Sequence, residues 1–315
     1  MEYIILVVAL TGVVFGADYL VSGAVSIAKK YHVSDFVIGA AIVGVGTSMP
    51  EFVVSFLGAL NGNADVAIGN VVGSNIFNVL GILGITALFF PIVIDKKNLR
   101  FEIPLCIGFS ILLTVLVFNF FNGGSTTISR VDGIMLLLVF VAYMWYSFAR
   151  DRKSIIASAV DGENESPLWK AIIKVVGGLA LLIISCDFFV DNAVLIAKSY
   201  GVDDGFISLT LIACGTSLPE LAASVVAAVK KNTDMALGNI IGSNIFNITL
   251  ILGVSSQVMP LTSSGITYVD YIVMIVVAVL PLIMGIRGKI SRVGGLLMLL
   301  AFVSYNIYLV TNQIS

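Results

Sequence analysis

The sequence G-A-A-I-V-G-V-G-T-S-M-P-E-F-V-V-S at residues 39–55, followed by I-G-N-V-V-G-S-N-I-F-N at 68–78, is repeated later in the chain. The second copy reads S-L-T-L-I-A-C-G-T-S-L-P-E-L-A-A-S at 208–224 and L-G-N-I-I-G-S-N-I-F-N at 237–247. Subtracting 169 from a position in the second copy gives its partner in the first without a gap, so Glu220 corresponds to Glu51. We call residues 39–78 the first motif and residues 208–247 the second motif.

The composition is that of an integral membrane protein. The 315 residues are 58% hydrophobic and 11% charged, with a mean hydropathy of +1.06, whereas soluble domains carry about 25% charged residues. A helix that crosses a bilayer needs about 20 mostly apolar residues. We expect ten such spans, at residues 3–28, 36–60, 66–90, 101–121, 131–149, 169–197, 206–229, 235–259, 268–286 and 293–312.

The distribution of positive charge orients these spans. With the N-terminus outside, the loops on the inner side collect fifteen of the 17 Lys and Arg residues, and only Arg130 and Lys198 lie outside. Cytoplasmic loops of membrane proteins are enriched in Lys and Arg. The sequence therefore predicts an all-α membrane protein with ten transmembrane helices and both termini outside. A compact chain without a large central loop is typical of a multi-pass protein of a prokaryotic cell membrane.

The two motifs divide the chain into related halves. We expect a first five-helix repeat at residues 1–150, a cytoplasmic linker at 151–167 and a second five-helix repeat at 168–315. Because five is an odd number of spans, the second half enters the membrane in the opposite orientation. Inverted repeats of this kind are typical of alternating-access transporters, whose substrates bind near the bilayer midplane.

Each motif places a carboxylate deep in an apolar span. Glu51 and Glu220 lie roughly 15 residues from the starts of their spans, or about 22 Å at 1.5 Å per residue. No Lys, Arg or His lies at a comparable depth in any predicted span, so the partner of each carboxylate is either a proton or a bound metal cation. Pro50 and Pro219 lack an N–H group, which predicts released backbone carbonyls one turn earlier.

The remaining polar groups of the motifs supply neutral oxygen atoms. Thr47 and Glu51 are four residues apart and share a helix face, and Ser74 and Asn78 repeat this spacing. A site made only of oxygen atoms suits a hard cation such as Ca²⁺, and the lack of Cys and His in the shared pattern argues against zinc, copper and iron. Two carboxylates balance one Ca²⁺ or two Na⁺. We expect no cofactor, and no disulfide from the chain's three cysteines.

The repeated G-T-S-[LM]-P-E and G-S-N-I-F-N sequences resemble those of the cation/calcium exchanger superfamily, in particular its prokaryotic sodium/calcium exchanger branch. The resemblance implies a core of spans two, three, seven and eight that binds the ions, with spans one and six sliding across it. It also implies backbone ligands near Gly44 and Ala213. The side-chain ligands that it implies are Thr47, Ser48, Glu51, Ser74, Asn78, Thr216, Ser217, Glu220, Ser243 and Asn247. Some members, notably potassium-dependent exchangers, carry Asp where this chain has Asn247.

The resemblance implies a secondary antiporter that exchanges about three Na⁺ for each Ca²⁺ and therefore carries net charge. Its expected partners are Na⁺, Ca²⁺ and the lipid bilayer, without nucleic acid, and monomer and homodimer both remain open. H⁺/Ca²⁺ exchange and potassium-dependent exchange are the nearest alternatives, and a cation channel could use the same oxygen atoms. An intramembrane hydrolase is disfavoured because Ser48 and Ser217 have no base at their depth, so we do not expect an enzyme.

Overall fold

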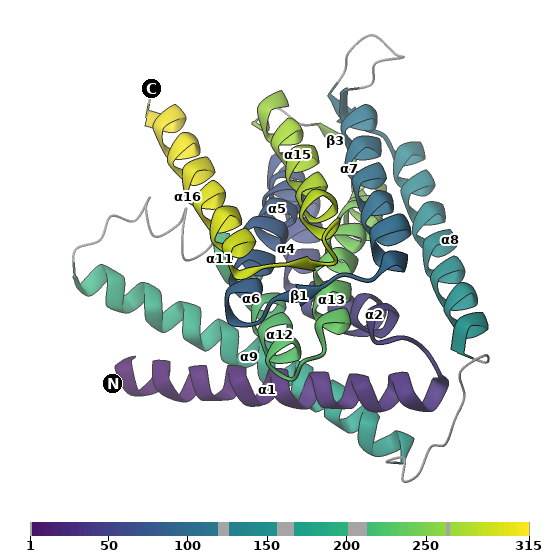
Figure 1. Cartoon of the computed structure of the whole chain (residues 1–315). Helices are drawn as coiled ribbons and strands as arrows, with labels where there is room; N and C mark the ends of the chain where they lie inside the picture. The colour runs from purple at the N-terminus through teal and green to yellow at the C-terminus, as the bar shows by residue number, and fades with distance from the viewer. Residues whose placement is uncertain (1, 119–125, 156–166, 201–212, 263–264, 315) are drawn as a thin grey trace.

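A computed structural model describes residues 2–118, 126–155, 167–200, 213–262 and 265–314 of the chain (Figure 1). In these residues the regular secondary structure is helical apart from four two-residue strands. Residues 208–212 of the second motif and 156–166 of the predicted linker lie outside the described residues. The helix α8 (Arg130–Ile155) continues beyond the predicted end of the fifth span at residue 149.

Eight helical segments in the described ranges are long and apolar enough to cross a membrane, and a bent pair makes a ninth. The eight are α1 (Glu2–Tyr31), Ala64–Phe89, Asn98–Phe118, Arg130–Arg150 within α8, α9 (Leu168–Ser199), Thr233–Val258, α15 (Tyr268–Gly285) and Arg292–Thr311 within α16 (Arg292–Ile314). The bent pair joins Asp35–Thr47 to Met49–Leu60 at 50°. The remaining predicted span, 206–229, is described only from Ala213 onward, as α11 (Ala213–Gly215) and α12 (Leu218–Val229).

Several of these spans contain π-helical turns instead of continuous α-helix. The second span consists of α2 (Asp35–Ile38), η1 (Gly39–Gly44), α3 (Val45–Thr47) and α4 (Met49–Leu60). The third consists of α5 (Ala64–Phe77), η2 (Asn78–Leu83) and α6 (Gly84–Phe89), and the fourth of η3 (Asn98–Glu102) and α7 (Ile103–Phe118). The eighth repeats the third as α13 (Thr233–Phe246), η5 (Asn247–Ile251) and α14 (Leu252–Val258).

The segments that carry the two motifs form the interior of the molecule. Almost every residue of α13 is buried, and α13 packs against α2 and η1. Glycine makes this contact possible, since a Cβ atom on Gly238 would lie 2.2 Å from the carbonyl oxygen of Phe36 and one on Gly242 would lie 2.4 Å from the Cα of Ala40. Small residues allow such close approach between helices in membranes. The equivalent glycines of the first motif make no such backbone contact: a Cβ atom on Gly69 would meet only the side chain of Ile266, at 3.1 Å, and one on Gly73 would meet nothing within 4 Å.

The helices α1 and α9 pack along each other and run obliquely across the more upright core helices (Figure 1). Their backbones meet at glycines. A Cβ atom on Gly16 would lie 2.6 Å from the backbone nitrogen of Leu182, and one on Gly178 would lie 2.5 Å from that of Leu20. Because the contact is this close along two long helices, we expect α1 and α9 to move as one body.

Two short antiparallel ladders connect loops of the first half to loops of the second. β1 (Ile92–Val93) pairs with β4 (Lys289–Ile290), and β2 (Thr127–Ile128) pairs with β3 (Leu261–Thr262). Each ladder therefore links one inter-helix loop of the first half to one inter-helix loop of the second.

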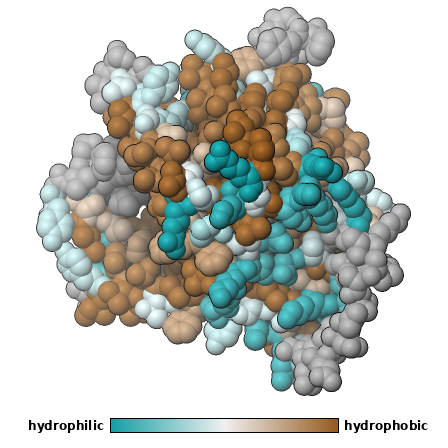
Figure 2. All heavy atoms as spheres, in the orientation of Figure 1, coloured by the Kyte–Doolittle hydropathy of each residue, from teal (hydrophilic) through white to brown (hydrophobic). Residues whose placement is uncertain are grey.

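The outer surface is apolar, as a surface in contact with lipid must be. Large hydrophobic side chains are exposed along α1, α8, α9 and α16, among them Trp145, Leu138 and Val293. Figure 2 shows apolar residues over much of the visible surface, with hydrophilic residues gathered in the middle and lower part of the view. The protein is therefore an integral membrane protein with multiple membrane-spanning helices.

Candidate cation-binding site

Both glutamates of the motifs lie in the first turn of a helix that begins inside the protein. The chain leaves helical geometry at Ser48 (φ −82°, ψ 9°) and at Ser217 (φ −91°, ψ 7°), and α4 and α12 begin directly afterwards with a proline in the first turn. Proline is tolerated there because the first N–H groups of a helix have no partner within it. Those free N–H groups favour negative charge, so each break places a carboxylate where the backbone stabilises it.

The two carboxylates are held by hydroxyls of the opposite motif. The hydroxyl of Ser48 donates to Oε1 of Glu220 at 2.7 Å, and the hydroxyl of Ser217 donates to Oε1 of Glu51 at 2.6 Å. Glu51 and Glu220 are each only 1% exposed. The fold therefore brings the two motifs together through a pair of mirrored hydrogen bonds.

Several buried oxygen atoms of the motifs have no hydrogen-bond partner. Among the described residues these include Oε2 of Glu51 and of Glu220, Oδ1 of Asn78 and of Asn247, and the hydroxyl of Thr216. Leaving a buried acceptor without a donor costs roughly 1–3 kcal/mol, and more when the acceptor is charged. A bound cation removes this cost because it binds oxygen lone pairs directly. All five atoms belong to residues that the sequence predicts as ligands.

The orientation of Asn78 and Asn247 is set by a second mirrored pair, Asn75 and Asn244. Nδ2 of Asn78 donates to Oδ1 of Asn244 at 2.9 Å, and Nδ2 of Asn247 donates to Oδ1 of Asn75 at 3.1 Å. Asn75 and Asn244 also donate to each other's backbone carbonyls, at 3.4 and 3.3 Å. With their nitrogen atoms occupied in this way, Asn78 and Asn247 keep their oxygen atoms free of donors.

A π-helical turn begins at each of these two amides. η2 begins at Asn78 and η5 begins at Asn247, so the same irregularity occurs at equivalent positions of both motifs. Single π-helical turns occur frequently at functional sites, because they change the direction in which a side chain projects. The repetition at equivalent residues indicates that both turns serve the site.

Two further asparagines act on the backbone of the glutamates. Nδ2 of Asn70 donates to the carbonyl of Glu51 at 3.0 Å and to the hydroxyl of Ser55 at 2.9 Å. In the other half, Nδ2 of Asn239 donates to the carbonyl of Glu220 at 3.1 Å and to the hydroxyl of Ser224 at 2.8 Å. Our sequence interpretation did not identify these asparagines or Asn75 and Asn244, although the repeated G-N and S-N pairs of the motifs contain them.

The other expected ligands lie in different environments. Thr47 donates to the carbonyl of Val43 at 2.9 Å, and Ser74 and Ser243 are buried. The carbonyl of Gly44, which we expected Pro50 to release, accepts the N–H of Ser48 at 3.0 Å and the hydroxyl of Ser243 at 3.3 Å. Its bond from Ser48 is the ordinary helical one, because the N–H that Pro50 lacks would have reached the carbonyl of Gly46 and not that of Gly44. Ala213 is the first described residue of α11.

The available ligands of this site suit a hard cation. No group of three or more His, Cys, Asp or Glu residues that could hold a metal occurs in the described ranges, so two carboxylates and neutral oxygen atoms are the available ligands. The affinity of oxygen sites for Ca²⁺ rises with the number of charged ligands. Two carboxylates among neutral oxygen atoms therefore fit a hard cation such as Ca²⁺.

Comparison with known proteins agrees with this chemistry. The family described as sodium/calcium exchanger protein matches residues 1–149 and 170–311. The sodium/calcium exchanger MaX1 of Methanosarcina acetivorans is 32% identical over 98% of this chain and 98% of its own length, and the inner membrane protein YrbG of Escherichia coli is 35% identical over 88% and 86%. A solved structure of the sodium-calcium exchanger NCX_Mj, soaked with zero Na⁺ and Ca²⁺, is similar at a TM-score of 0.83 and 31% identity, covering 98% of both chains.

Proposed function

Because the chain belongs to the sodium/calcium exchanger protein family, we propose that it is an antiporter that exchanges Na⁺ for Ca²⁺ across a prokaryotic cell membrane. The observation that carries this proposal is the pair Glu51 and Glu220. Each is buried, each accepts one hydroxyl from the opposite motif, and each keeps one oxygen atom without a donor. Transported Ca²⁺ and Na⁺ are the cations that we assign to these oxygen atoms.

We assign the full set of expected ligands to this transport site. The carboxylates carry the charge, and the hydroxyl, amide and backbone oxygen atoms complete the coordination of a hard cation. The set comprises Thr47, Ser48, Glu51, Ser74 and Asn78 from the first motif, Thr216, Ser217, Glu220, Ser243 and Asn247 from the second, and the backbone near Gly44 and Ala213.

The charge of the core gives a reason for obligatory exchange. An empty core holds two carboxylates without a cation, and enclosing uncompensated charge in a protein interior costs several kcal/mol per ion. The empty protein should therefore return slowly, and a return step needs Na⁺. One Ca²⁺ neutralises the two carboxylates, whereas three Na⁺ leave one net positive charge. Exchange of three Na⁺ for one Ca²⁺ would therefore move charge in the Na⁺ step.

The proposed architecture is a ten-helix inverted repeat that works by alternating access, with the N- and C-termini outside. The reciprocal hydrogen bonds between Ser48 and Glu220 and between Ser217 and Glu51 support it, since they relate the two motifs by a common symmetry. The ladders support it as well, because β1 and β4 come from loops that the ten-span order puts inside, and β2 and β3 from loops that it puts outside.

The test is calcium flux in proteoliposomes loaded with Na⁺. We expect uptake of Ca²⁺ when an outward Na⁺ gradient is imposed, no uptake when only a pH gradient is imposed, and no requirement for K⁺. Clamping the membrane potential with K⁺ and valinomycin should change the rate if net charge moves. Uptake driven by protons alone would identify an H⁺/Ca²⁺ exchanger, and Ca²⁺ flux without any counter-ion would identify a channel.

A further inference from the structure

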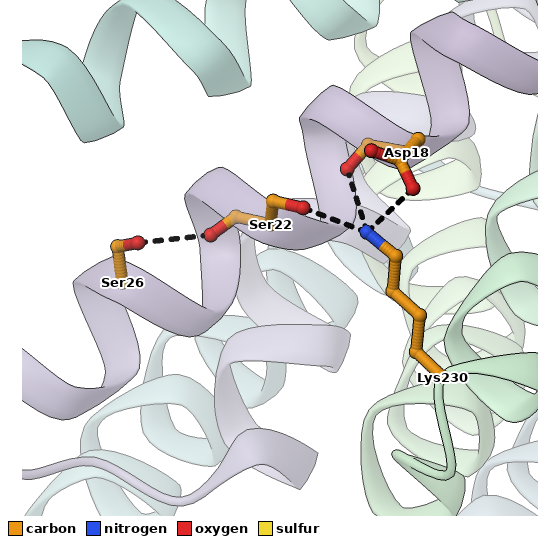
Figure 3. Close-up of polar contacts among 4 residues, drawn as sticks. All are labelled: Asp18, Ser22, Ser26 and Lys230. Carbon is orange, nitrogen blue, oxygen red and sulfur yellow. Dashed lines mark hydrogen bonds and ion pairs between the residues drawn. The ribbon is translucent and has the colours of Figure 1, made fainter.

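The lysine at the end of α12 contacts α1 about midway along its length (Figure 3). Nζ of Lys230 lies 2.6 Å from Oδ1 of Asp18 and donates to the backbone carbonyl of Asp18 at 3.3 Å and to the hydroxyl of Ser22 at 2.7 Å. The side chains of Lys230 and Asp18 are 34% and 48% exposed. Three contacts from one ammonium group thus join the core to a helix that lies across it.

This contact has no charged equivalent in the repeat. Subtracting 169 from 230 gives Asn61, and adding 169 to 18 gives Asp187, so the mirrored contact would place an amide beside a carboxylate. The packing of the helices around this contact also differs between the two halves. α1 packs along α12, whereas α9 makes no comparable contact with α4 in the residues that the structure describes. An inverted repeat with unequal contacts of this kind is in one of two mirror-related states.

We propose that Lys230 is a positioning residue that stabilises this state over its mirror image by holding α1 against the end of α12. The proposal rests on the function proposed above, because it concerns the equilibrium between the two access states of that antiporter. Asp18 and Ser22 are the groups on α1 through which Lys230 acts.

The sequence of α1 explains why the contact is lost in the other state. Asp18, Ser22 and Ser26 follow one another at intervals of four residues and therefore form a polar stripe on one face of α1. Ser26 donates to the carbonyl of Ser22 at 3.0 Å (Figure 3). If α1 moves by one helical turn, about 5.4 Å, towards its N-terminal end, Lys230 faces Ser22 and Ser26 and has no carboxylate.

A further displacement in that direction is opposed by charge. The residues that next approach Lys230 are Lys29 and Lys30 in the last turn of α1, and like charges repel. Because α9 is packed closely against α1, it has to follow the same displacement. The energetic effect of a partly exposed ion pair is modest, so we expect the pair to shift the ratio of the two states roughly two- to fivefold.

The experiment compares Lys230→Asn with Lys231→Asn. Both remove one positive charge from the same loop, and Asn tolerates the positive φ of 63° at Lys231. We expect Lys230→Asn and Asp18→Asn to increase hydrogen–deuterium exchange in residues 18–30 and 224–231, and Lys231→Asn to leave it unchanged. In vesicles of known orientation, the ratio of apparent Ca²⁺ affinities on the two sides should change roughly two- to fivefold with Lys230→Asn and with Asp18→Asn, but not with Lys231→Asn.

Asn61→Lys provides an independent test at the mirrored position. It supplies Asp187 with a cation in the other state, so it should shift the affinity ratio in the same direction as Lys230→Asn. The ten-span order puts positions 61 and 230 in loops on opposite sides of the membrane, so the effects of the two substitutions should add in the double variant. A shift in opposite directions, or equal behaviour of Lys230→Asn and Lys231→Asn in both measurements, would overturn the proposal.

The two proposals fail separately in this design. Wild-type Na⁺-driven Ca²⁺ flux with unchanged exchange protection in Lys230→Asn removes the role of Lys230 and leaves antiport in place. If the wild-type protein carries no Ca²⁺ but Lys230→Asn still increases hydrogen–deuterium exchange, antiport is removed and the contact remains as a determinant of helix position.

Discussion

The hydroxyl of Ser217 lies 2.6 Å from a carboxylate oxygen of Glu51, which is 166 positions away in the opposite motif. The same contact between Ser48 and Glu220, at 2.7 Å, repeats this arrangement with the two halves exchanged. Each half therefore supplies the charge that the other half positions. This reciprocal arrangement needs both copies of the G-T-S-x-P-E sequence.

Loss of either serine hydroxyl should weaken calcium binding. Ser48→Ala and Ser217→Ala each remove a hydrogen bond to a charged acceptor, which contributes about 1.5–3 kcal/mol, and a neutral oxygen ligand. We expect Ca²⁺ affinity, measured by calorimetry on the purified protein, to fall at least about tenfold. Ser48→Thr and Ser217→Thr keep the hydroxyl and should retain most of the affinity. Equal affinity of the Ala and Thr variants would show that the hydroxyls do not act on the cation.

Replacing either glutamate by glutamine should abolish calcium transport. Glu51→Gln and Glu220→Gln keep the shape of the side chain but leave one carboxylate to balance a divalent cation, and the uncompensated charge costs several kcal/mol. We expect Ca²⁺ uptake per folded molecule to fall by about a hundredfold or more. Glu102→Gln is the matched control, because Glu102 is equally buried at 1% exposure but lies in η3, outside the two motifs. Wild-type flux in Glu51→Gln or Glu220→Gln would exclude the proposed site.

The sequence was sufficient to predict the class of protein and the two glutamates that the fold buries against the opposite motif. Hydropathy predicts the helical segments to within a few residues where the structure describes both ends, and the gapless offset of 169 predicts that Glu51 and Glu220 are equivalent. Both predictions depend on local properties of the chain, namely apolar length and repeated spacing. The confirmed family adds cation exchange to these predictions.

The details that the sequence did not predict depend on tertiary contacts. The π-helical turns at Asn78 and Asn247 leave no trace in the hydropathy pattern, because every residue of η2 is buried and no polar face marks a change of register. The bond from Lys230 to Asp18 joins residues in different halves, so no local spacing reveals it. The hydrogen-bonded carbonyl of Gly44 likewise depends on Ser243, 199 positions away.

The close contact of α13 with the second span should make Gly238 sensitive to substitution. A Cβ atom there would lie 2.2 Å from the carbonyl oxygen of Phe36, and this backbone atom cannot move aside as a side chain can. Overpacking a protein interior costs about 1–3 kcal/mol, so we expect Gly238→Ala to lower the thermal unfolding midpoint in detergent. Gly177→Ala in α9 is the control, since no atom lies within 4 Å of the added methyl group. Equal midpoints for the two variants would contradict the close packing.

A third carboxylate in the core should strengthen calcium binding and slow calcium release. Asn247→Asp adds a negative charge to the two that the core already holds, and Ca²⁺ affinity in oxygen sites rises with the number of charged ligands. The change also replaces the amide that donates to Oδ1 of Asn75 at 3.1 Å with an acceptor, which offsets part of the gain. We expect the dissociation constant for Ca²⁺ to fall roughly tenfold and the maximal exchange rate to fall with it.

Two variants separate the effect of charge from that of the lost donor. Asn247→Ala removes the amide without adding charge, and it should weaken Ca²⁺ binding. Asn78→Asp makes the same replacement against Asn244, where the amide donates at 2.9 Å, and it should resemble Asn247→Asp if the two motifs contribute equally to one site. Calorimetry and flux on the same preparations give affinity and rate together. If Asn247→Asp binds Ca²⁺ no more tightly than Asn247→Ala, the oxygen atom at position 247 does not face the cation. That result would contradict a symmetric site and would favour one that is centred on the first motif.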